Sequence, residues 1–380
     1  MANSSARVLP AGTVCLSRTA SVGFVVVMGR PMATSQDFVN WVCSERLNNH
    51  FLKYALLAEQ AALRMFAVGS VHPTIYFPEV KAFHICLPPR DEQDRIVEIL
   101  GALDEKIDLN RRMNETLEAM ARAIFKDWFV DFGPTRAKME GRPPYLAPDL
   151  WSLFPDRLDD DGKPNGWEST TLAELAARHS GSQIRTGPFG SQLHQADYSA
   201  AGTPVVMPTN LLGGEISEVN IARVDAETAA RLKEHALAGG DIVYGRRGDI
   251  GRKSLVGIDQ HGWICGTGCL KLRIRAPECP PIYLYFYLDL STTREWISAR
   301  AVGATMPNLN TSIIGEVQVP LPGQHLCSAF AAIATEYRRR ADVSRRESAS
   351  LVKMRDLLLP RLMSGEVRIR EADALMAAVA

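Results

Sequence analysis

The fold of this 380-residue chain is decided by the stretch Ile96–Asn110, which reads IVEILGALDEKIDLN. Around it, residues repeat every seven positions along two neighbouring tracks. The first track holds Ile96, Leu103, Asn110, Leu117 and Ile124, and the second holds Leu100, Ile107, Asn114, Ala121 and Trp128. This heptad pattern predicts one helix over residues 91–130, a rod about 60 Å long at 1.5 Å per residue.

A second, weaker copy of the pattern covers residues 324–363. An apolar stripe on a long helix has to be buried, and each helix is the nearest partner for the other. We therefore expect an antiparallel pair, in which the polar seam residues Asn110 and Asn114 fix the register. The alternative, in which each helix lies on its own domain, stays open. The predicted seam consists of Ile96, Leu100, Leu103, Ile107, Asn110, Asn114, Leu117, Ile124, Phe330, Tyr337, Leu351 and Leu358.

The two helices are the last parts of a longer internal repeat. Residues 68–73 read VGSVHP and residues 302–307 read VGATMP, an offset of 234 that also relates Ile85 to Val319. Residues 12–18 (GTVCLSR) resemble residues 240–246 (GDIVYGR) at an offset of 228. Each repeat has short apolar alternations typical of strands, then a proline, then the helical pattern. The sequence therefore predicts an α/β (α+β) tandem repeat with pseudo-two-fold symmetry.

The composition excludes several classes of protein. Hydrophobic residues make up 46% of the chain and charged residues 23%, which is typical of globular proteins. Forty-three basic residues balance 43 acidic ones, so the chain is no polycation that coats nucleic acid, although this balance leaves room for a local basic face. No apolar run reaches the roughly 18 residues of a membrane span, and residues 1–7 lack the layout of a signal peptide. Seven scattered cysteines favour a reducing cytoplasm over a disulfide framework.

Motifs that would carry catalysis do not meet their chemical requirements. The segment Arg142-Pro-Pro-Tyr145 begins with an arginine, which only donates hydrogen bonds, where an amino-methyltransferase needs a side-chain carbonyl. In residues 248–254, Arg252 replaces the glycine that precedes the lysine of a phosphate-binding loop. Cys265 and Cys269 match no strong zinc spacing, so small buried thiols on strands are favoured. The sequence thus predicts no catalytic residue, no metal site and no cofactor in this chain.

Three loops of the second repeat concentrate glycine, arginine, asparagine and glutamine, at residues 183–193, 244–253 and 303–311. Glycine lets backbone amides approach phosphate, arginine and lysine neutralise it, and arginine, glutamine and asparagine bond base edges. A solvated role for any single loop stays open, but the three together favour DNA contact. The candidate DNA-binding residues are Arg185, Thr186, Phe189, Ser191, Gln192, Arg246, Arg247, Arg252, Lys253, Thr305, Asn308 and Asn310.

With these motifs the chain resembles the DNA-specificity subunits of type I restriction-modification systems. The strongest match is residues 87–132, from LPPRDEQDRI through KIDLNRR to FKDWFVDF, which resembles the family's central conserved helix. Residues 154–167 resemble the start of the second target-recognition domain, and residues 186–191, 246–251 and 307–310 resemble its recurring loops. The resemblance implies two α/β target-recognition domains separated by two long antiparallel, coiled-coil-like helices.

The resemblance also implies a function and partners. Each target-recognition domain would read one half of a bipartite double-stranded DNA target. The helices would act as a spacer that docks methyltransferase subunits, and motor-nuclease subunits would join for cleavage. The methyl donor S-adenosylmethionine, ATP and magnesium would belong to those partners. We expect a non-catalytic, cytoplasmic subunit, without a membrane partner, of a complex that methylates adenine and cleaves DNA.

The resemblance divides the chain into six parts. These are a partial first target-recognition domain (1–90), the central helix (91–130), a connector (131–166), a second target-recognition domain (167–322), a second long helix (323–364) and a tail (365–380). Clusters of proline, glycine and aspartate predict a connector without regular structure, anchored by Trp151, Phe154 and Trp167. Mapping Trp167 back by the repeat offset implies that about 67 residues of the first domain are missing, and we expect unpaired strand edges there.

Two other functions stay open. An orphan scaffold would hold methyltransferase subunits without recognising DNA specifically, because its first domain is incomplete; neighbouring methyltransferase and translocase genes would favour the intact role. A metal-dependent nuclease would need a set of paired carboxylates, and none stands out in the sequence.

Overall fold

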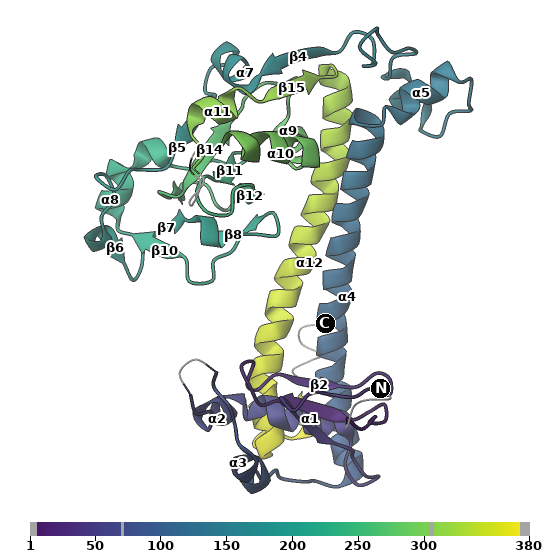
Figure 1. Cartoon of the computed structure of the whole chain (residues 1–380), viewed down its shortest axis with the longest axis vertical. Coiled ribbons are helices and arrows are strands. Elements are labelled where there is room, and N and C mark those ends of the chain that lie inside the picture. Colours follow the sequence, from purple (N-terminus) through teal and green to yellow (C-terminus); the bar gives the residue numbers. More distant parts are fainter. Residues whose placement is uncertain (1–5, 70–71, 302, 304–307, 373–380) are drawn as a thin grey trace. The chain divides into compact units, whose positions relative to one another are not determined.

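The computed structural model of the chain describes residues 6–69, 72–301, 303 and 308–372. The chain divides into two compact units. Unit 1 consists of the residues up to 115 together with those from 341 onward, and unit 2 consists of residues 116–340. Each unit therefore combines a sheet-containing part with one portion of each long helix (Figure 1). The expected mixture of short strands and two long helices is confirmed.

Unit 1 contains one small antiparallel sheet with the strand order β2–β1–β3. Its apolar residues, among them Val14 and Leu16, pack against Leu52 and Leu56 of a helix that covers the sheet. The side chain of Asn48 caps this helix by accepting the backbone N–H groups of its first turn. The elements are β1 (Val14–Ser17), β2 (Val25–Val27), β3 (Phe38–Trp41), α1 (Asn49–Ala58), α2 (Gln60–Met65) and α3 (Phe77–Ala82), with parts of α4 (Arg90–Phe129) and α12 (Gln324–Ser364).

Unit 2 contains two four-stranded sheets and two short strand pairs. The first half of its chain provides α5 (Gly133–Met139), α6 (Pro148–Ser152), β4 (Glu168–Thr171), α7 (Leu172–Arg178), β5 (Gln183–Thr186), η1 (Gln195–Asp197), β6 (Tyr198–Ser199), β7 (Thr203–Val206), η2 (Pro208–Asn210), β8 (Leu211–Leu212), β9 (Glu215–Ile216) and β10 (Ala222–Val224). The second half provides α8 (Ala226–Arg231), η3 (Lys233–His235), β11 (Ile242–Gly245), β12 (Lys253–Leu255), β13 (Ile264–Cys265), β14 (Cys269–Arg273), α9 (Pro281–Tyr287), α10 (Ser291–Arg300), α11 (Thr311–Gly315) and β15 (Gln318–Leu321).

The sheets of unit 2 are mostly antiparallel. One has the order β12–β11–β14–β5, and the other has the order β13–β7–β10–β6, in which only β13 and β7 are parallel. The remaining pairs are β15 with β4 and β8 with β9. The first sheet packs on α9 through Tyr244 and Leu270, which are fully buried in the largest core of the unit.

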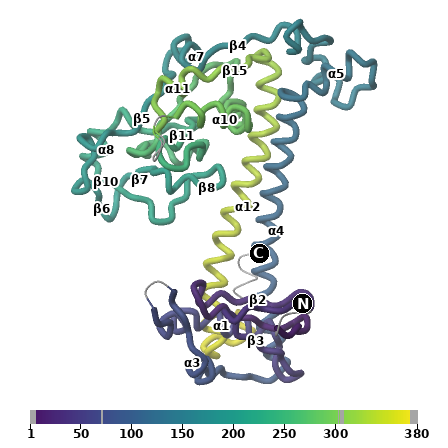
Figure 2. The backbone as a smooth tube through the Cα atoms, in the orientation of Figure 1, coloured from purple at the N-terminus to yellow at the C-terminus, as the bar shows by residue number. Residues whose placement is uncertain are grey.

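Helices α4 and α12 lie side by side and antiparallel in each unit (Figures 1 and 2). In unit 1, Asp104 accepts from Arg355 at 3.0 Å and, farther along α4, Asn110 donates to the carbonyl oxygen of Ser344. Residue numbers along α12 therefore fall as those along α4 rise, so the two helices run in opposite directions. In unit 2, the ring centroids of Phe125 and Phe330 are 5.3 Å apart. The predicted antiparallel pair is confirmed.

The predicted seam residues are buried or half-buried in both units. Leu100 and Phe330 are fully buried, as is the polar Asn110. The heptad tracks missed Phe125 and Phe129, which are nearly as buried because α9 forms a third wall against the helix pair in unit 2. Heptad spacing predicts the residues at a contact between two helices, but not those that a third element buries. Among the described residues, neither these helices nor any shorter one is long and apolar enough to cross a membrane.

Asn110 and Ser344 mark the local pseudo-two-fold axis of the helix pair. They lie 234 residues apart, which is the offset of the repeat. The amide of Asn110 donates to the carbonyl oxygen of Ser344 at 3.3 Å, and the hydroxyl of Ser344 donates to the carbonyl oxygen of Asn110 at 3.5 Å. Only residues on a two-fold axis contact their own counterparts reciprocally. The symmetry predicted from the sequence is therefore present at this contact.

The sheets repeat as well. Strands β1 and β2 match β11 and β12 at the offset of 228, and β3 matches β14. The N–H of Ile75 donates to the carbonyl oxygen of Arg18 at 2.9 Å, and the counterpart bond from Leu309 to Arg246 measures 2.8 Å. Within the described part of unit 1, no strand matches β4 or β5 of unit 2.

The connector differs from the prediction. Residues 131–166 are not irregular throughout, because they form the short helices α5 and α6. Pro134 and Pro148 lie in the first turns of these helices, where proline costs no hydrogen bond. The expected anchoring is confirmed for Phe154, which is buried with its ring centroid 5.2 Å from that of Trp128.

Candidate nucleic-acid interface

The three loops predicted to contact DNA all belong to unit 2. The β5 loop (187–194) follows β5, the β11–β12 loop (246–252) joins two neighbouring strands, and the α10–α11 loop (301–310) precedes α11. Of the last loop, residues 301, 303 and 308–310 are described, so the candidate Thr305 lies outside the described residues.

Arg246 connects these loops. Its Nη1 donates to the side-chain oxygen of Asn308 at 3.1 Å, and its carbonyl oxygen accepts the N–H of Leu309, so it fixes the α10–α11 loop. Its guanidinium carbon lies 5.8 Å from the ring centroid of Phe189 in the β5 loop. Because one side chain contacts residues from two other loops, the loops form one surface.

A fourth loop belongs to this surface, and the sequence analysis missed it. Residues 266–268 join β13 to β14, and their carbonyl groups accept the backbone N–H of Arg246 and its Nε. A Cβ atom on Gly187 would come within 1.9 Å of the carbonyl oxygen of Gly266, so only glycine lets the β5 loop approach this turn. The signal available in the sequence was the pair of glycines between Cys265 and Cys269, which was interpreted only as part of a thiol pair.

Two of the candidate DNA contacts, Arg246 and Lys253, are buried. Arg246 is 3% exposed and Lys253 is 5% exposed. The ammonium of Lys253 pairs with the carboxylate of Asp289, which also pairs with Arg122 of α4. A buried ammonium paired with this half-buried carboxylate cannot reach a phosphate without losing its partner. Both side chains therefore hold the loops in place from the interior of the unit.

Arg247 is the best-placed cation for DNA in the β11–β12 loop. It is exposed, and its side chain makes no hydrogen bond or ion pair with the residues that the structure describes. Gly248 follows it with φ of +72°, a left-handed conformation that glycine adopts readily. Arg252, also exposed, pairs with Asp249 at 2.7 Å, which partly neutralises it. Arg294 of α10 lies beside Gly251, and this exposed cation was not among the candidates.

In the β5 loop, Phe189, Ser191 and Gln192 are exposed. The side-chain oxygen of Gln192 accepts the N–H of Phe189 at 3.1 Å, so its amide nitrogen stays available as a donor. Phe189 is 56% exposed, and its ring centroid lies 5.8 Å from the guanidinium carbon of Arg246. These three residues fit a contact surface.

The remaining candidates have structural partners. Arg185 pairs with Glu234 at 3.1 Å, and the carbonyl oxygen of Thr186 lies 3.0 Å from Nδ1 of His235. Asn310 caps α11 by accepting the N–H of Ile313 at 2.8 Å. Asn308, half-buried, accepts from Arg246, as described above. These contacts hold the loops and the adjoining strand in place.

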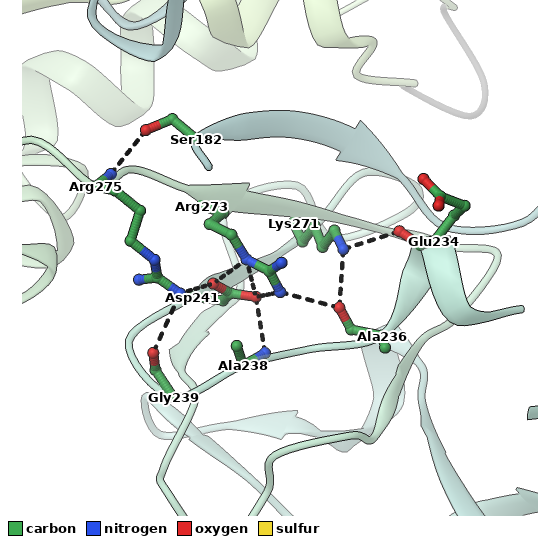
Figure 3. A network of polar contacts seen from close by, with 9 residues as sticks. All are labelled: Ser182, Glu234, Ala236, Ala238, Gly239, Asp241, Lys271, Arg273 and Arg275. Atoms are coloured by element: carbon green, nitrogen blue, oxygen red, sulfur yellow. Dashed lines mark hydrogen bonds and ion pairs between the residues drawn. The ribbon is translucent and has the colours of Figure 1, made fainter. Parts of the chain in front are cut away.

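A buried charge network supports the sheet beneath the loops (Figure 3). The carboxylate of Asp241, 0% exposed, accepts from Arg273 at 2.6 Å and from Arg275 at 3.1 Å, and it also accepts the backbone N–H of Ala238. A buried carboxylate is tolerated because several donors replace its lost water. The network ties the segment before β11 to β14.

Lys271 belongs to the same network and is held by backbone carbonyl groups. Its ammonium donates to the carbonyl oxygens of Glu234 and Ala236 at 2.9 and 2.8 Å (Figure 3). Burial, helped by the neighbouring charge of Arg273, lowers the pKa of Lys271 to about 8. The lysine holds η3 against the sheet, next to β5 and its loop.

The thiols of Cys265 and Cys269 are buried at the adjoining ends of β13 and β14, as expected for small thiols on strands. Burial raises the pKa of Cys265 to about 12, which keeps it protonated. Among the residues described, no group of three or more histidine, cysteine or acidic side chains is arranged to hold a metal ion.

Comparison with known proteins connects this geometry to one family. The family model described as type I restriction modification DNA specificity domain matches residues 1–119 and 164–325. The MjaIX specificity subunit of a type I restriction enzyme from Methanocaldococcus jannaschii is 24% identical, covering 97% of this chain and 80% of its own length. The HindI specificity subunit from Haemophilus influenzae is 26% identical, covering 78% of this chain and 71% of its own.

A solved structure shares the fold. The S subunit of a type I restriction-modification system from M. genitalium aligns with a TM-score of 0.57 at 18% identity, over 94% of this chain and 84% of that chain. The match to the family model covers most of the chain in two segments, one from each repeat. The chain therefore belongs to the family of type I restriction-modification DNA specificity proteins.

Proposed function

We propose that this chain is the DNA-recognition subunit of a type I restriction-modification complex, and that it reads one half of a bipartite target through the loops of unit 2. The observation that carries this proposal is the convergence of the β5, β11–β12 and α10–α11 loops on Arg246. The convergence gathers the exposed side chains of Phe189, Gln192 and Arg247. Arginine and glutamine have the donors that base edges and phosphates accept.

The assembly is part of the same proposal. The outer face of the α4–α12 pair would dock methyltransferase subunits, and motor-nuclease subunits would join the complex. Leu109, Met113 and Met120 of α4 leave apolar surface exposed on this face. The chain itself would be non-catalytic and cytoplasmic, with S-adenosylmethionine, ATP and magnesium in the partners. The division into six segments made from the sequence stays part of this proposal.

The test is selection of DNA by the purified full-length chain, alone and with the methyltransferase encoded beside its gene. Duplexes with a randomised core should be enriched for one short motif. Arg247→Ala should lower affinity by about 1–3 kcal/mol and relax the motif if the arginine contacts a base. If it contacts a phosphate, the same change should mainly lower the salt dependence.

Arg178→Ala is the matched control. Arg178 is also an exposed arginine, but it belongs to α7, which precedes β5, whereas the candidate loop follows β5. It should leave both affinity and motif unchanged. Equal effects of the two substitutions, or enrichment of no motif, would contradict the proposal.

The second candidate is a scaffold that binds methyltransferase without selecting DNA. The observation that favours it is the smaller sheet of unit 1, whose described residues include no counterpart of β4 or β5. It predicts a stable complex with methyltransferase, no enriched motif and no loss on Arg247→Ala.

A further inference from the structure

One nitrogen of the Arg246 side chain has no hydrogen-bond partner. Its Nε donates to the carbonyl oxygen of Thr267 at 3.2 Å, and its Nη1 donates to the side-chain oxygen of Asn308 at 3.1 Å. Among the described residues, no acceptor lies within hydrogen-bond distance of Nη2, although this atom is buried. A buried donor without an acceptor costs free energy, so its presence calls for an acceptor that comes from outside the described chain.

The positive charge of Arg246 has no counter-charge either. The buried ammonium of Lys253, in the same part of unit 2, pairs with the carboxylate of Asp289. Within the part of the chain that the structure describes, Arg246 forms no such pair, and both of its acceptors are neutral. Burial and the neighbouring charge of Arg247 lower the pKa of Arg246, yet an arginine keeps its proton in a protein. The missing partner of Nη2 is therefore best supplied by an anion.

The internal repeat contains the same arrangement twice. Arg18 of unit 1 occupies the position of Arg246 at the offset of 228. Its Nε donates at 2.9 Å to the carbonyl oxygen of Gln36, which precedes β3 by two residues, just as the acceptor of Arg246 precedes β14. An aromatic ring lies against the guanidinium in both repeats, with 5.2 Å from ring centroid to guanidinium carbon for Phe77 and 5.8 Å for Phe189. The way this arginine is held is thus a property of the repeat.

The ring of Phe189 is placed to act as a movable cover for Arg246. Among the described residues, the hydrophobic cores of unit 2 do not include Phe189, whose side chain is 56% exposed. Its backbone is held by the N–H groups of Gln192 and Leu193, which donate to its carbonyl oxygen at 2.8 and 3.2 Å. The ring can therefore change rotamer while the loop stays in place.

A phosphodiester group of DNA fits the free donor better than a base does. It supplies the missing negative charge, and it protrudes from the duplex, so it can enter a recess. An arginine reads guanine through two donors side by side, whereas two of the three nitrogens of Arg246 are already bound to the protein. The exposed Arg247, next in sequence, adds a second positive charge for the same backbone.

We propose that Nη2 of Arg246 binds one phosphodiester group of DNA, and that this site opens when the ring of Phe189 turns aside. Nε and Nη1 keep the loops together in both states, while Nη2 donates to a phosphate oxygen. The proposal deepens the DNA recognition proposed above and rests on DNA binding by unit 2. It adds a recessed contact to the exposed side chains of the loops.

The cover is tested by modifying the arginines of the full-length chain with phenylglyoxal and identifying the products by mass spectrometry. Arg246 should react slowly in the wild type and faster in Phe189→Ala, because the variant uncovers Nη2. A duplex of random sequence should protect Arg246 in the variant, since phosphate contacts need no particular sequence. Arg178, exposed on α7, is the internal control and should react alike in both chains, with and without DNA.

The phosphate is tested with duplexes that carry the motif selected by the wild-type chain. Each duplex contains one methylphosphonate, a neutral analogue of the phosphodiester, at a different position. One position should lower the affinity of the wild type about tenfold, as for the loss of a charge-assisted hydrogen bond. Asn308→Asp should reduce this penalty to less than about twofold, because its carboxylate gives Arg246 a counter-charge and a second acceptor oxygen.

Asn310→Asp is the matched control for the added charge. It places the same charge in the same loop, and aspartate caps α11 as well as asparagine does. The side chain of Asn310 accepts from Ile313, so the substitution does not supply Arg246 with an anion. It should weaken the binding of every duplex alike and keep the penalty of about tenfold at the sensitive phosphate.

Two results would overturn the inference while leaving DNA recognition intact. Equal reaction of Arg246 in the wild type and in Phe189→Ala would show that the ring is not a cover. A scan in which Asn308→Asp removes the penalty at no phosphate would mean that water satisfies Nη2.

Enrichment of no motif would count against the proposed function instead. Protection of Arg246 by the random duplex would then decide the inference by itself. Protection would support a phosphate contact without sequence selection, and unchanged reactivity of Arg246 in the presence of the duplex would overturn the inference as well.

Discussion

Units 1 and 2 share a three-stranded antiparallel core but differ in what is buried beside it. At the position of the fully buried Asp241 in unit 2, unit 1 has Thr13, and at the position of Arg273 it has Val42. Backbone pairing is the same in both, because it depends on strand direction and register and not on these side chains. The buried carboxylate occurs in the unit whose sheet edge is covered by β5, where donors surround it on all sides.

The helix pair shows the same contrast. In unit 1 its contact is aliphatic, formed by Ile96, Leu100 and Leu103 with Leu358 and Leu362. In unit 2 it is a cluster of aromatic rings that α9 completes. Phe51 and Tyr54 of α1 complete this core in unit 1.

The largest expected effect is that of Leu103→Asp. Leu103 is 1% exposed, and burying an unpaired carboxylate there should cost more than about 4 kcal/mol. Hydrogen exchange followed by mass spectrometry should show faster exchange of α4 and α12 in unit 1, with unit 2 still protected. Leu109→Asp, at a 52% exposed position six residues on, should change little. Similar effects of the two changes would mean that the seam has been misassigned.

The next largest effect is expected for Asp241→Ala. It leaves the guanidinium groups of Arg273 and Arg275 without their carboxylate and should destabilise unit 2 by about 3 kcal/mol. The repeat offers the control Thr13→Ala, which removes one hydrogen bond to Pro10 and should cost about 1 kcal/mol in unit 1. Urea unfolding monitored by hydrogen exchange separates the units. A cost at Thr13 equal to that at Asp241 would remove the distinction drawn between them.

A smaller effect distinguishes the two equivalent arginines. Arg246→Ala should destabilise unit 2 by about 1–3 kcal/mol, because a buried guanidinium bonds Thr267 and Asn308. Arg18→Ala in unit 1 should cost about 1 kcal/mol or less, since Arg18 is only half-buried. Proteolysis rates of the α10–α11 loop report on Arg246 directly. An unchanged rate in Arg246→Ala would show that this arginine does not hold the loops together.

A last effect is a pH dependence specific to unit 2. The pKa of Lys271 is lowered to about 8 in the folded chain, whereas an unfolded lysine has a pKa of about 10.4. Between these values the unfolded chain binds more protons, so stability rises with pH from about 8 to about 10. The counterpart of Lys271 in unit 1 is the uncharged Asn40, so the stability of unit 1 should lack this pH dependence.

Lys271→Met should abolish the part of the increase in stability with pH that Lys271 contributes. The quantity to compare is the stability difference between wild type and variant, measured by urea unfolding at about pH 7 and about pH 9.5, on either side of the lowered pKa. A difference that does not change with pH would mean that Lys271 titrates normally.

Much of the candidate interface could be predicted from loop composition, but the role of individual residues could not. Arg246 and Arg247 are adjacent and chemically identical, yet one is 3% exposed and the other extends into solvent. Strand alternation implies that neighbours face opposite sides, but it does not say which side another loop will cover. The burial of Lys253 was missed for the same reason, because its partner Asp289 is distant in sequence.

The sequence by itself determined the two long helices, their antiparallel seam and the internal repeat, because these depend on periodicity and on offsets within the chain. It even contained the symmetry axis, since the offset of 234 relates Asn110 to the residue that it contacts. Only the tertiary structure decided which cations are buried and where a fourth loop joins the surface. These depend on contacts between residues far apart in the chain, for which local patterns carry no signal.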